Sequence, residues 1–383
     1  MFVRDRLTWL AYLALATYAY LQASLGPLMP FLRAELDLSY TVAGFHFSAF
    51  ALGMIGAGLA ADVAARRYSR RLVFWLGAAG MAAGAVALVL AQRVALSIGS
   101  IFVMGLLGSL LLVMIQAVLA DHHGPRRAIA LTESNVAASI FASLVPLLIG
   151  GFQRVGIGWR AALVLPALAF LLLYVLFRDV GISGGRPGAG SAPAPVRPLP
   201  TLFWLYWLVL FFGVAIEWSI LFWSADYLEN VVGLTKASAA AAVSIMLAAM
   251  VIGRIGGSRL VHRWPAQRLL PAAVLVAFAG FLLFWLLPFP PAALSGLFVA
   301  GLGIANLFPL SLSVATEVTA DRLDTASARL SLAGGLAILL APLALGGIAD
   351  QQGIQVAFAL VALLLLMATG ITFSANRVAA RQP

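Results

Sequence analysis

The apolar residues of this chain arrive in about a dozen blocks, each long enough to cross a membrane as a helix. A helix needs roughly 20 apolar residues to span the hydrocarbon core of a bilayer, where it satisfies its own backbone hydrogen bonds. Hydrophobic residues make up 63% of the sequence and charged residues only 10%, which excludes a water-soluble domain of this size. The alternating pattern of a membrane β-barrel is absent. The sequence therefore predicts an all-α membrane protein.

The polar breaks between the blocks predict twelve transmembrane helices in two pseudo-symmetric bundles of six (the six-helix bundles). The first bundle, residues 1–180, has helices at 7–31, 40–64, 71–91, 95–120, 128–152 and 159–178. The second bundle, residues 201–383, has helices at 201–229, 237–262, 266–287, 291–317, 326–350 and 354–375. Between them, residues 181–200 are rich in Gly and Pro and indicate a flexible cytoplasmic linker.

A short motif is repeated in the two bundles. PLLIGG at 146–151 ends the fifth predicted helix, and PLALGG at 342–347 ends the eleventh. Two similar bundles around a central cavity can open to one side of a membrane and then to the other. The repeat therefore favours a transport architecture.

The net charge of +10 is explained by membrane topology rather than by nucleic-acid binding. Most of the 24 Lys and Arg residues fall in loops on one side of the predicted bundle. The positive-inside rule places that side, with both termini, in the cytoplasm, and we expect the plasma membrane (the bacterial inner membrane). The apolar stretch from Leu7 to Phe31 is too long for a signal peptide and is expected to be the first span. With no cysteine, neither disulfides nor thiolate metal sites can form.

A glycine, an acidic residue and a cluster of arginines lie between the second and third predicted helices. Gly58 is followed four positions later by Asp62. The arginines of this loop are Arg66, Arg67, Arg70 and Arg71. The counterpart in the second bundle has Gly257, Arg259 and Arg263 but no acidic residue.

This loop resembles that of the major facilitator superfamily, in which a glycine is followed by an acidic residue and by arginines. The resemblance covers nearly the whole chain and implies a twelve-helix transporter. Here the arginines begin four residues after Asp62, and Ser69 stands where a glycine is usual. Glycines let helices approach closely, and Asp62 can hold an arginine or a neighbouring helix end. We expect a conformational latch; arginines that only set topology are the alternative.

An acidic residue, Glu217, lies near the middle of the seventh predicted helix. A carboxylate there costs roughly 2.5 to 3.5 kcal/mol on insertion scales unless it faces a wet cavity or is protonated. We therefore expect Glu217 to couple transport to protons, with a structural hydrogen bond as the alternative. Glu133, one turn inside the fifth helix, is the second proton-coupling candidate. Asp226 and Glu229 are expected on a solvated face at the outer mouth.

Aromatic residues accompany Glu217 on the seventh helix. Trp218 and Trp223 offer flat surfaces that can stack on sugars and other rings, so both are candidate substrate contacts. The acidic-then-aromatic order is similar to the fucose-permease-like branch of the superfamily and implies a sugar symporter. Anchoring of these rings at the membrane interface is the alternative.

A polar stripe follows the fifth helix within an arc of about 80° at 100° per residue. Its members are Thr132, Asn135, Ser139, Ser143, Pro146 and Gly150. We expect a cavity wall with Asn135 and Ser139 as substrate contacts; helix packing through small residues is the alternative. Further candidate substrate contacts are Gln22, Gln116 and Asn306, whereas His46 is expected to pack between helices.

Together these features predict a secondary active transporter of a small organic solute, working by alternating access as a proton-coupled symporter. The alternatives are a proton-coupled drug or metabolite efflux antiporter and a non-transporting receptor on the same fold. The antiporter motif of the superfamily is degenerate here because Val145 precedes Pro146. The only lysine, Lys236, lies outside any phosphate-binding loop, so an ATP-driven pump is excluded. An enzyme is disfavoured because the four histidines are scattered.

The expected partners are a small-molecule substrate, protons and the lipid bilayer, and the expected state is a monomer. No cofactor, metal or nucleic acid is expected.

Overall fold

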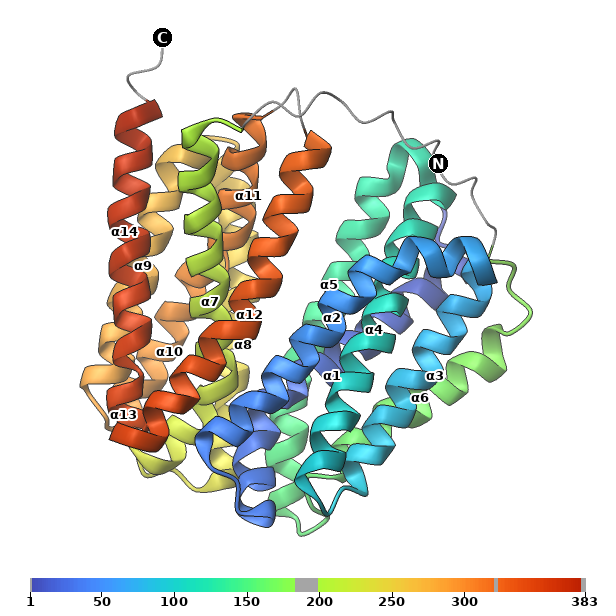
Figure 1. The fold of residues 1–383 in the computed structure, drawn as a ribbon, viewed down its shortest axis with the longest axis horizontal. Helices are drawn as coiled ribbons and strands as arrows, with labels where there is room; N and C mark the ends of the chain where they lie inside the picture. Colours follow the sequence, from blue (N-terminus) through green and yellow to red (C-terminus); the bar gives the residue numbers. More distant parts are fainter. Residues whose placement is uncertain (1, 183–198, 320–322, 380–383) are drawn as a thin grey trace. The chain divides into compact units, whose positions relative to one another are not determined.

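The computed structural model describes residues 2–182, 199–319 and 323–379, apart from the side chains of residues 62, 323, 324 and 379 (Figure 1). The chain divides into two compact units. The first contains Met1–Leu38 and Phe45–Val196, and the second contains Ser39–Gly44 and Arg197–Pro383. The domain prediction placed all of residues 1–180 in one bundle, whereas the short segment 39–44 packs with the second unit. Most of the predicted linker, residues 183–198, lies outside the described part.

In the described part of the first unit, six long helices are joined by short loops (Figure 1). They are α1 (Arg6–Leu36), α2 (Tyr40–Tyr68), α3 (Arg70–Val89), α4 (Val94–His123), α5 (Arg127–Arg154) and α6 (Ala161–Phe177), with a 3-10 turn, η1 (Gly124–Arg126), before α5. Each helix coincides closely with an apolar block of the sequence. An apolar block lies in the hydrocarbon core, where no water is present, so its backbone N–H and C=O groups must hydrogen-bond to each other within a helix.

The second unit repeats this order, with two of its spans interrupted. Its helices are α7 (Thr201–Asn230), α8 (Lys236–Val261), α9 (Ala266–Leu286), α10 (Pro290–Ile304), α11 (Leu307–Glu317), α12 (Leu323–Gln352), α13 (Ile354–Ala357) and α14 (Ala359–Ala379). The predicted helix at 291–317 is broken between α10 and α11, and the one at 354–375 is broken between α13 and α14. At the first break, the Asn306 amide donates to Gly253 O at 3.0 Å and to Leu302 O at 3.4 Å.

Within the described residues, nine stretches are long and apolar enough to span a membrane. One of them, Val94–Arg154, contains both α4 and α5. The shorter apolar helix α6 and the amino-terminal helix α1 complete the twelve spans that the sequence predicted. The all-α membrane fold is therefore confirmed.

Glycines allow the closest helix crossings in both units. In the first unit, an added Cβ at Gly53 of α2 would lie 2.5 Å from Leu106 N of α4. In the second, α9 and α10 meet through Gly280, Gly296 and Gly303, where an added Cβ would press on the backbone of the opposite helix. α7 packs on α12 and α14 in the same unit (Figure 1). Small residues at such contacts are how membrane helices gain packing without a hydrophobic driving force.

Ion pairs fasten the start of α1 to the ends of neighbouring helices in the first unit. Asp5 caps α1, because its Oδ1 accepts the Thr8 N–H at 2.9 Å. Arg6 donates to Asp179 Oδ2 at 2.7 Å and to Asp179 Oδ1 at 3.1 Å, beyond the end of α6. This bond to Arg6 holds the pKa of Asp179 below its usual range.

The Arg6–Asp179 pair should make stability depend on pH. A carboxyl group with a lowered folded-state pKa stabilises the fold above its unfolded-state pKa of about 3.9, and this contribution is lost as pH falls through the folded-state value. We expect a small deficit in the unfolding temperature of Asp179→Asn at pH 6, which shrinks as the pH is lowered below about 4. Thermal unfolding of both proteins over this pH range measures it. A deficit that grows on acidification would contradict the assignment.

Candidate functional site

Glu217 is a half-buried carboxylate in the middle of the 30-residue helix α7. Most of the helix around it is buried, including Ile216 and Ser219 on either side. No hydrogen bond or ion pair joins Glu217 to another described residue, and Arg254 of α8 acts on it electrostatically. A carboxylate without a fixed partner inside a membrane helix can change protonation state without breaking a structural bond. Proton coupling by Glu217 therefore stays a prediction, and the structure does not support the alternative of a structural hydrogen bond.

Three buried serines of the second unit were not selected from the sequence. Ser219 and Ser224 of α7 and Ser311 of α11 are fully buried. None of their hydroxyl oxygens has a hydrogen-bond partner in the described structure. Serine in a helix usually bonds the carbonyl one turn earlier, so free hydroxyls are polar groups available to water or a ligand. No local pattern in the sequence distinguishes these serines from those that only pack.

Glu133, the second proton-coupling candidate, is held by two residues of the first unit. Arg4 donates to both of its carboxylate oxygens, at 2.8 Å and 2.6 Å, and Tyr12 OH donates to Oε2 at 3.0 Å. A bidentate guanidinium pair stabilises the charged carboxylate. Glu133 therefore has fixed hydrogen-bond partners, unlike Glu217, and its bonds hold the amino-terminal segment against α5.

The polar stripe of α5 bonds to its own helix. Thr132, Asn135, Ser139 and Ser143 each donate to the carbonyl four residues earlier, at 2.7 to 2.8 Å. Asn135 is exposed, and none of the described residues donates to its amide oxygen. The stripe therefore forms a polar helix face on which Asn135 and Ser139 remain candidate substrate contacts.

The two glutamines of the first unit have different surroundings. Gln22 of α1 is half-buried, and its amide nitrogen lies 3.8 Å from Met54 Sδ of α2. Gln116 of α4 is exposed. Both stay candidate contacts, since no strong hydrogen bond joins either side chain to another described residue.

The aromatic candidates of α7 pack against the second unit. Trp223 is fully buried, and its Nε1 donates to Pro342 O of α12 at 2.9 Å. Trp218 is half-buried and packs against the apolar cluster of Leu221, Ala225 and Val243. In this conformation Trp223 has a packing role and no face open to a solute, which is a correction to its predicted place in a substrate site.

Asn306 and the second-half loop residue Gly257 lie together. An added Cβ at Gly257 would collide with the Asn306 side chain. Both residues line an apolar cavity of about 310 Å³ between α8, α9 and the α10–α11 span. The hydrogen bonds of Asn306 hold the interrupted span to α8, which is a structural role. Its role as a substrate contact stays a prediction. The two arginines predicted to act with Gly257, Arg259 and Arg263, are exposed.

The predicted latch in the first unit is built differently from the expectation. Arg70 pairs with Asp121 near the end of α4, and Arg71 donates to the carbonyl of Arg178 after α6. Arg66 and Arg67 are exposed, and the side chain of Asp62 lies outside the described part. An added Cβ at Gly58 would meet nothing within 4 Å, so the predicted close helix approach does not occur there. Two of the arginines thus link helix ends within one unit.

Ser69, where the family pattern has glycine, adopts a left-handed backbone with φ of 78°. Glycine adopts this conformation at the least cost. The Ser69 hydroxyl accepts the Leu72 N–H at 3.4 Å and caps α3. The cap offsets part of the backbone strain.

The acidic residues at the outer end of α7 are not both solvated as predicted. Asp226 is fully buried, whereas Glu229 is half-buried and pairs with Lys236 at 3.5 Å. The prediction for Asp226 was therefore wrong. It relied on distance from the helix middle, which does not report how neighbouring helices cover a side chain. His46 packs between helices as predicted, with Ser97 Oγ 2.8 Å from its Nε2.

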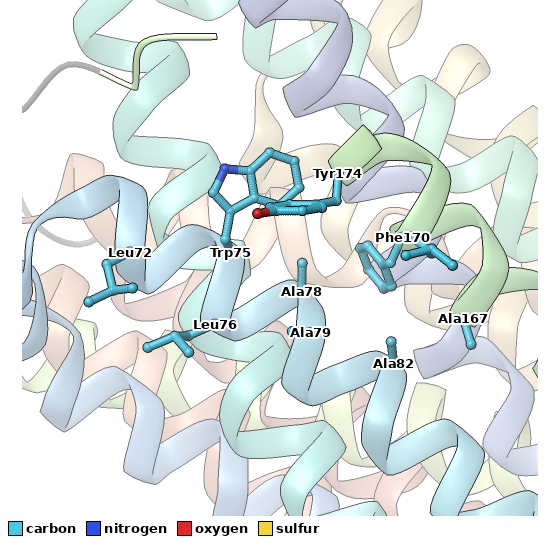
Figure 2. Close-up of a pocket in the computed structure, with 10 residues that line it drawn as sticks. Leu72, Trp75, Leu76, Ala78, Ala79, Ala82, Ala167, Phe170 and Tyr174 are labelled. Atoms are coloured by element: carbon cyan, nitrogen blue, oxygen red, sulfur yellow. The ribbon is translucent and has the colours of Figure 1, made fainter. Parts of the chain in front are cut away.

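An apolar cavity of about 370 Å³ lies between α3 and α6 of the first unit (Figure 2). Trp75 and Tyr174 meet edge to face at one end of it, with ring centroids 5.2 Å apart, and Phe170 and Ala82 line the other end. No predicted site residue lines this cavity. Its apolar walls suit hydrocarbon rather than a polar solute.

An interrupted span and a carboxylate in the middle of an apolar helix are features of membrane transport proteins. The family model of the Major Facilitator Superfamily matches residues 11–322. The chain belongs to this superfamily, and its relatives are transporters rather than enzymes.

Similar proteins agree with this membership. The chain is 26% identical over 357 residues to an uncharacterised MFS-type transporter of Yersinia pestis, covering 90% of this chain and 89% of that protein. It is 30% identical over 178 residues to an uncharacterised transporter of Sinorhizobium fredii, covering 46% and 47% of the two chains.

Solved structures share the fold at low sequence identity. The occupied inward-facing bacterial homologue of the human lysosomal transporter Spinster aligns with a TM-score of 0.79 at 16% identity, over 98% of each chain. The nucleoside transporter NupG aligns with a TM-score of 0.75 at 13% identity, also over 98% of each chain.

Proposed function

We propose that this protein is a secondary active transporter that moves a small organic solute together with protons by alternating access. Glu217 is the observation that supports proton coupling most directly. It is an ionisable group in mid-membrane with no hydrogen bond or ion pair to a described residue. A group that loads a proton on one side and releases it on the other must be free to change charge. Symport is the proposed direction because the antiporter motif is degenerate.

The other residues divide into two proposed roles. Asn135, Ser139, Gln116 and Gln22 of the first unit supply hydrogen bonds to the solute. The buried hydroxyl of Ser219, two residues from Glu217, is a further polar group in the second unit. Glu133 fastens the amino-terminal segment instead of moving a proton.

The proposed substrate is neutral or weakly polar. A phosphate or a dianion needs deep cationic groups, whereas Arg254, the arginine that acts electrostatically on Glu217, is exposed. Two structural neighbours are a nucleoside transporter and a peptide transporter, and both kinds of cargo are small organic solutes. We propose a plasma-membrane location with both termini in the cytoplasm, supported by the loop arginines, and a monomeric state.

The proposal can be tested in two steps. Purified protein is first screened by thermal shift against sugars, organic acids and lipophilic cations, because a ligand of the folded state raises the unfolding temperature. Each hit is then tested in liposomes with an imposed proton gradient. Solute uptake driven by an inward proton gradient supports symport. Solute efflux driven by the same inward proton gradient supports antiport. Binding without movement of any hit, under either gradient, contradicts the transport proposal and supports a receptor.

A further inference from the structure

Helix α2 begins in one unit and continues in the other. Its first turn, within Ser39–Gly44, belongs to the second unit, and the helix from Phe45 onward belongs to the first. A helix is a stiff rod held by bonds along its own axis. Any movement of one unit relative to the other must therefore release this first turn or bend α2 beside Gly44.

Asp350, near the end of α12, holds the first turn of α2 by its backbone. Its Oδ1 accepts the Tyr40 N–H at 2.7 Å, and its Oδ2 accepts the Thr41 N–H at 2.8 Å. The first N–H groups of a helix have no partner within the helix, and its amino end carries partial positive charge. One carboxylate thus satisfies two of these donors and complements the helix dipole.

A glycine of the repeated PLALGG motif lets α12 approach the first turn of α2 closely. An added Cβ at Gly346 would lie 2.6 Å from Tyr40 O, and one at Gly44 would lie 3.1 Å from Leu343 Cα. The Tyr40 ring lies 5.6 Å from the ring of Trp223, which is fixed to Pro342 O. Helices that meet at glycines can separate without disengaging interlocked side chains. The hydrogen bonds of Asp350 are therefore the specific interaction that stabilises the contact.

We infer that Asp350 is a gating residue: its two hydrogen bonds to α2 stabilise the conformation in which the first turn of α2 rests on α12. The cap must open once in each transport cycle. Topology puts the start of the second span and the end of the eleventh on the membrane face opposite the chain termini. The inference rests on the alternating access of the proposed function and is independent of Glu217, protons and substrate.

The absence of cysteine from the natural sequence allows a direct test. A single Leu343→Cys reports contact with α2, and Gln351→Cys, at an exposed position of the same helix, serves as the reference. Each is labelled with a polar maleimide in lipid nanodiscs, in the parent background and with Asp350→Ala. We expect the labelling rate at position 343 to rise about tenfold in Asp350→Ala, as loss of charge-assisted hydrogen bonds implies. The rate at position 351 should not change.

Three further variants separate gating from folding. Asp350→Asn should give an intermediate rate, since an amide has one acceptor oxygen in place of two. Asp350→Glu should restore slow labelling, and Gln352→Ala at the same helix end should leave it unchanged. Equal labelling at position 343 in the parent and in folded Asp350→Ala would overturn the inference; if that protein does not fold, equal labelling in Asp350→Asn would do so. Labelling needs neither solute nor proton gradient, so it can succeed where the proposed function fails.

Discussion

A Glu217→Gln variant should bind and exchange its solute like the parent protein but fail to accumulate it when a proton gradient is imposed. Glutamine keeps the size and hydrogen-bonding capacity of the protonated side chain and cannot release a proton. One coupled charge at 100 mV is worth about 2.3 kcal/mol, which corresponds to roughly 50-fold accumulation. We expect the variant to reach only equal concentrations on the two sides. Radiolabelled uptake into liposomes, with and without the gradient, measures both quantities.

Glu133→Gln is the matched control for this experiment. It removes a carboxylate from a membrane helix of the same protein, but one that is already paired with Arg4 and Tyr12. Gradient-driven accumulation should survive in Glu133→Gln, with a lower unfolding temperature. Normal accumulation by Glu217→Gln would remove Glu217 from proton coupling, even if solute transport itself were established.

The second large effect is expected at a helix crossing. Gly280→Ala should lower the stability of the second unit by about 1 to 3 kcal/mol, the usual cost of forcing an extra carbon into a packed interior. An added Cβ at Gly280 would press on the backbone nitrogen of Ala300 in α10, and a backbone atom cannot rotate away. Thermal unfolding in detergent, followed by tryptophan fluorescence, measures the loss.

Gly370→Ala in α14 provides the control. It makes the same chemical change in a helix of the same unit, but an added Cβ there would meet nothing within 4 Å. Alanine favours helix over glycine by up to about 1 kcal/mol, so this variant should be as stable as the parent or slightly more stable. Equal losses in the two variants would show that helix packing at Gly280 is not the cause.

The sequence predicts the spans well because the bilayer leaves a backbone few choices. Apolar length alone identifies helices such as α7 and α8 to within a few residues. It does not predict the break at Asn306, where an amide from one span bonds the carbonyl of Gly253 in another. Interruptions of this kind depend on contacts between distant segments, which a local pattern does not report.

Candidate site residues are predicted less completely, for the same reason. Glu217 stands out because a carboxylate in an apolar block is rare at any position. Ser219 and Ser311 are ordinary in sequence, and only their burial without a partner distinguishes them. Trp223 looks like a substrate contact until its bond to Pro342 is seen. Chemical identity can thus be read from the chain, whereas the direction of a side chain depends on its neighbours.

The divided helix α2 also has a consequence for biosynthesis. Asp350, which caps its first turn, lies 310 positions after Tyr40 in the chain, so it leaves the ribosome long after α2 has been made. Until then the leading amide groups of α2 must be hydrated or bonded elsewhere. A truncated product that stops before α12 would consequently lack the carboxylate that completes α2.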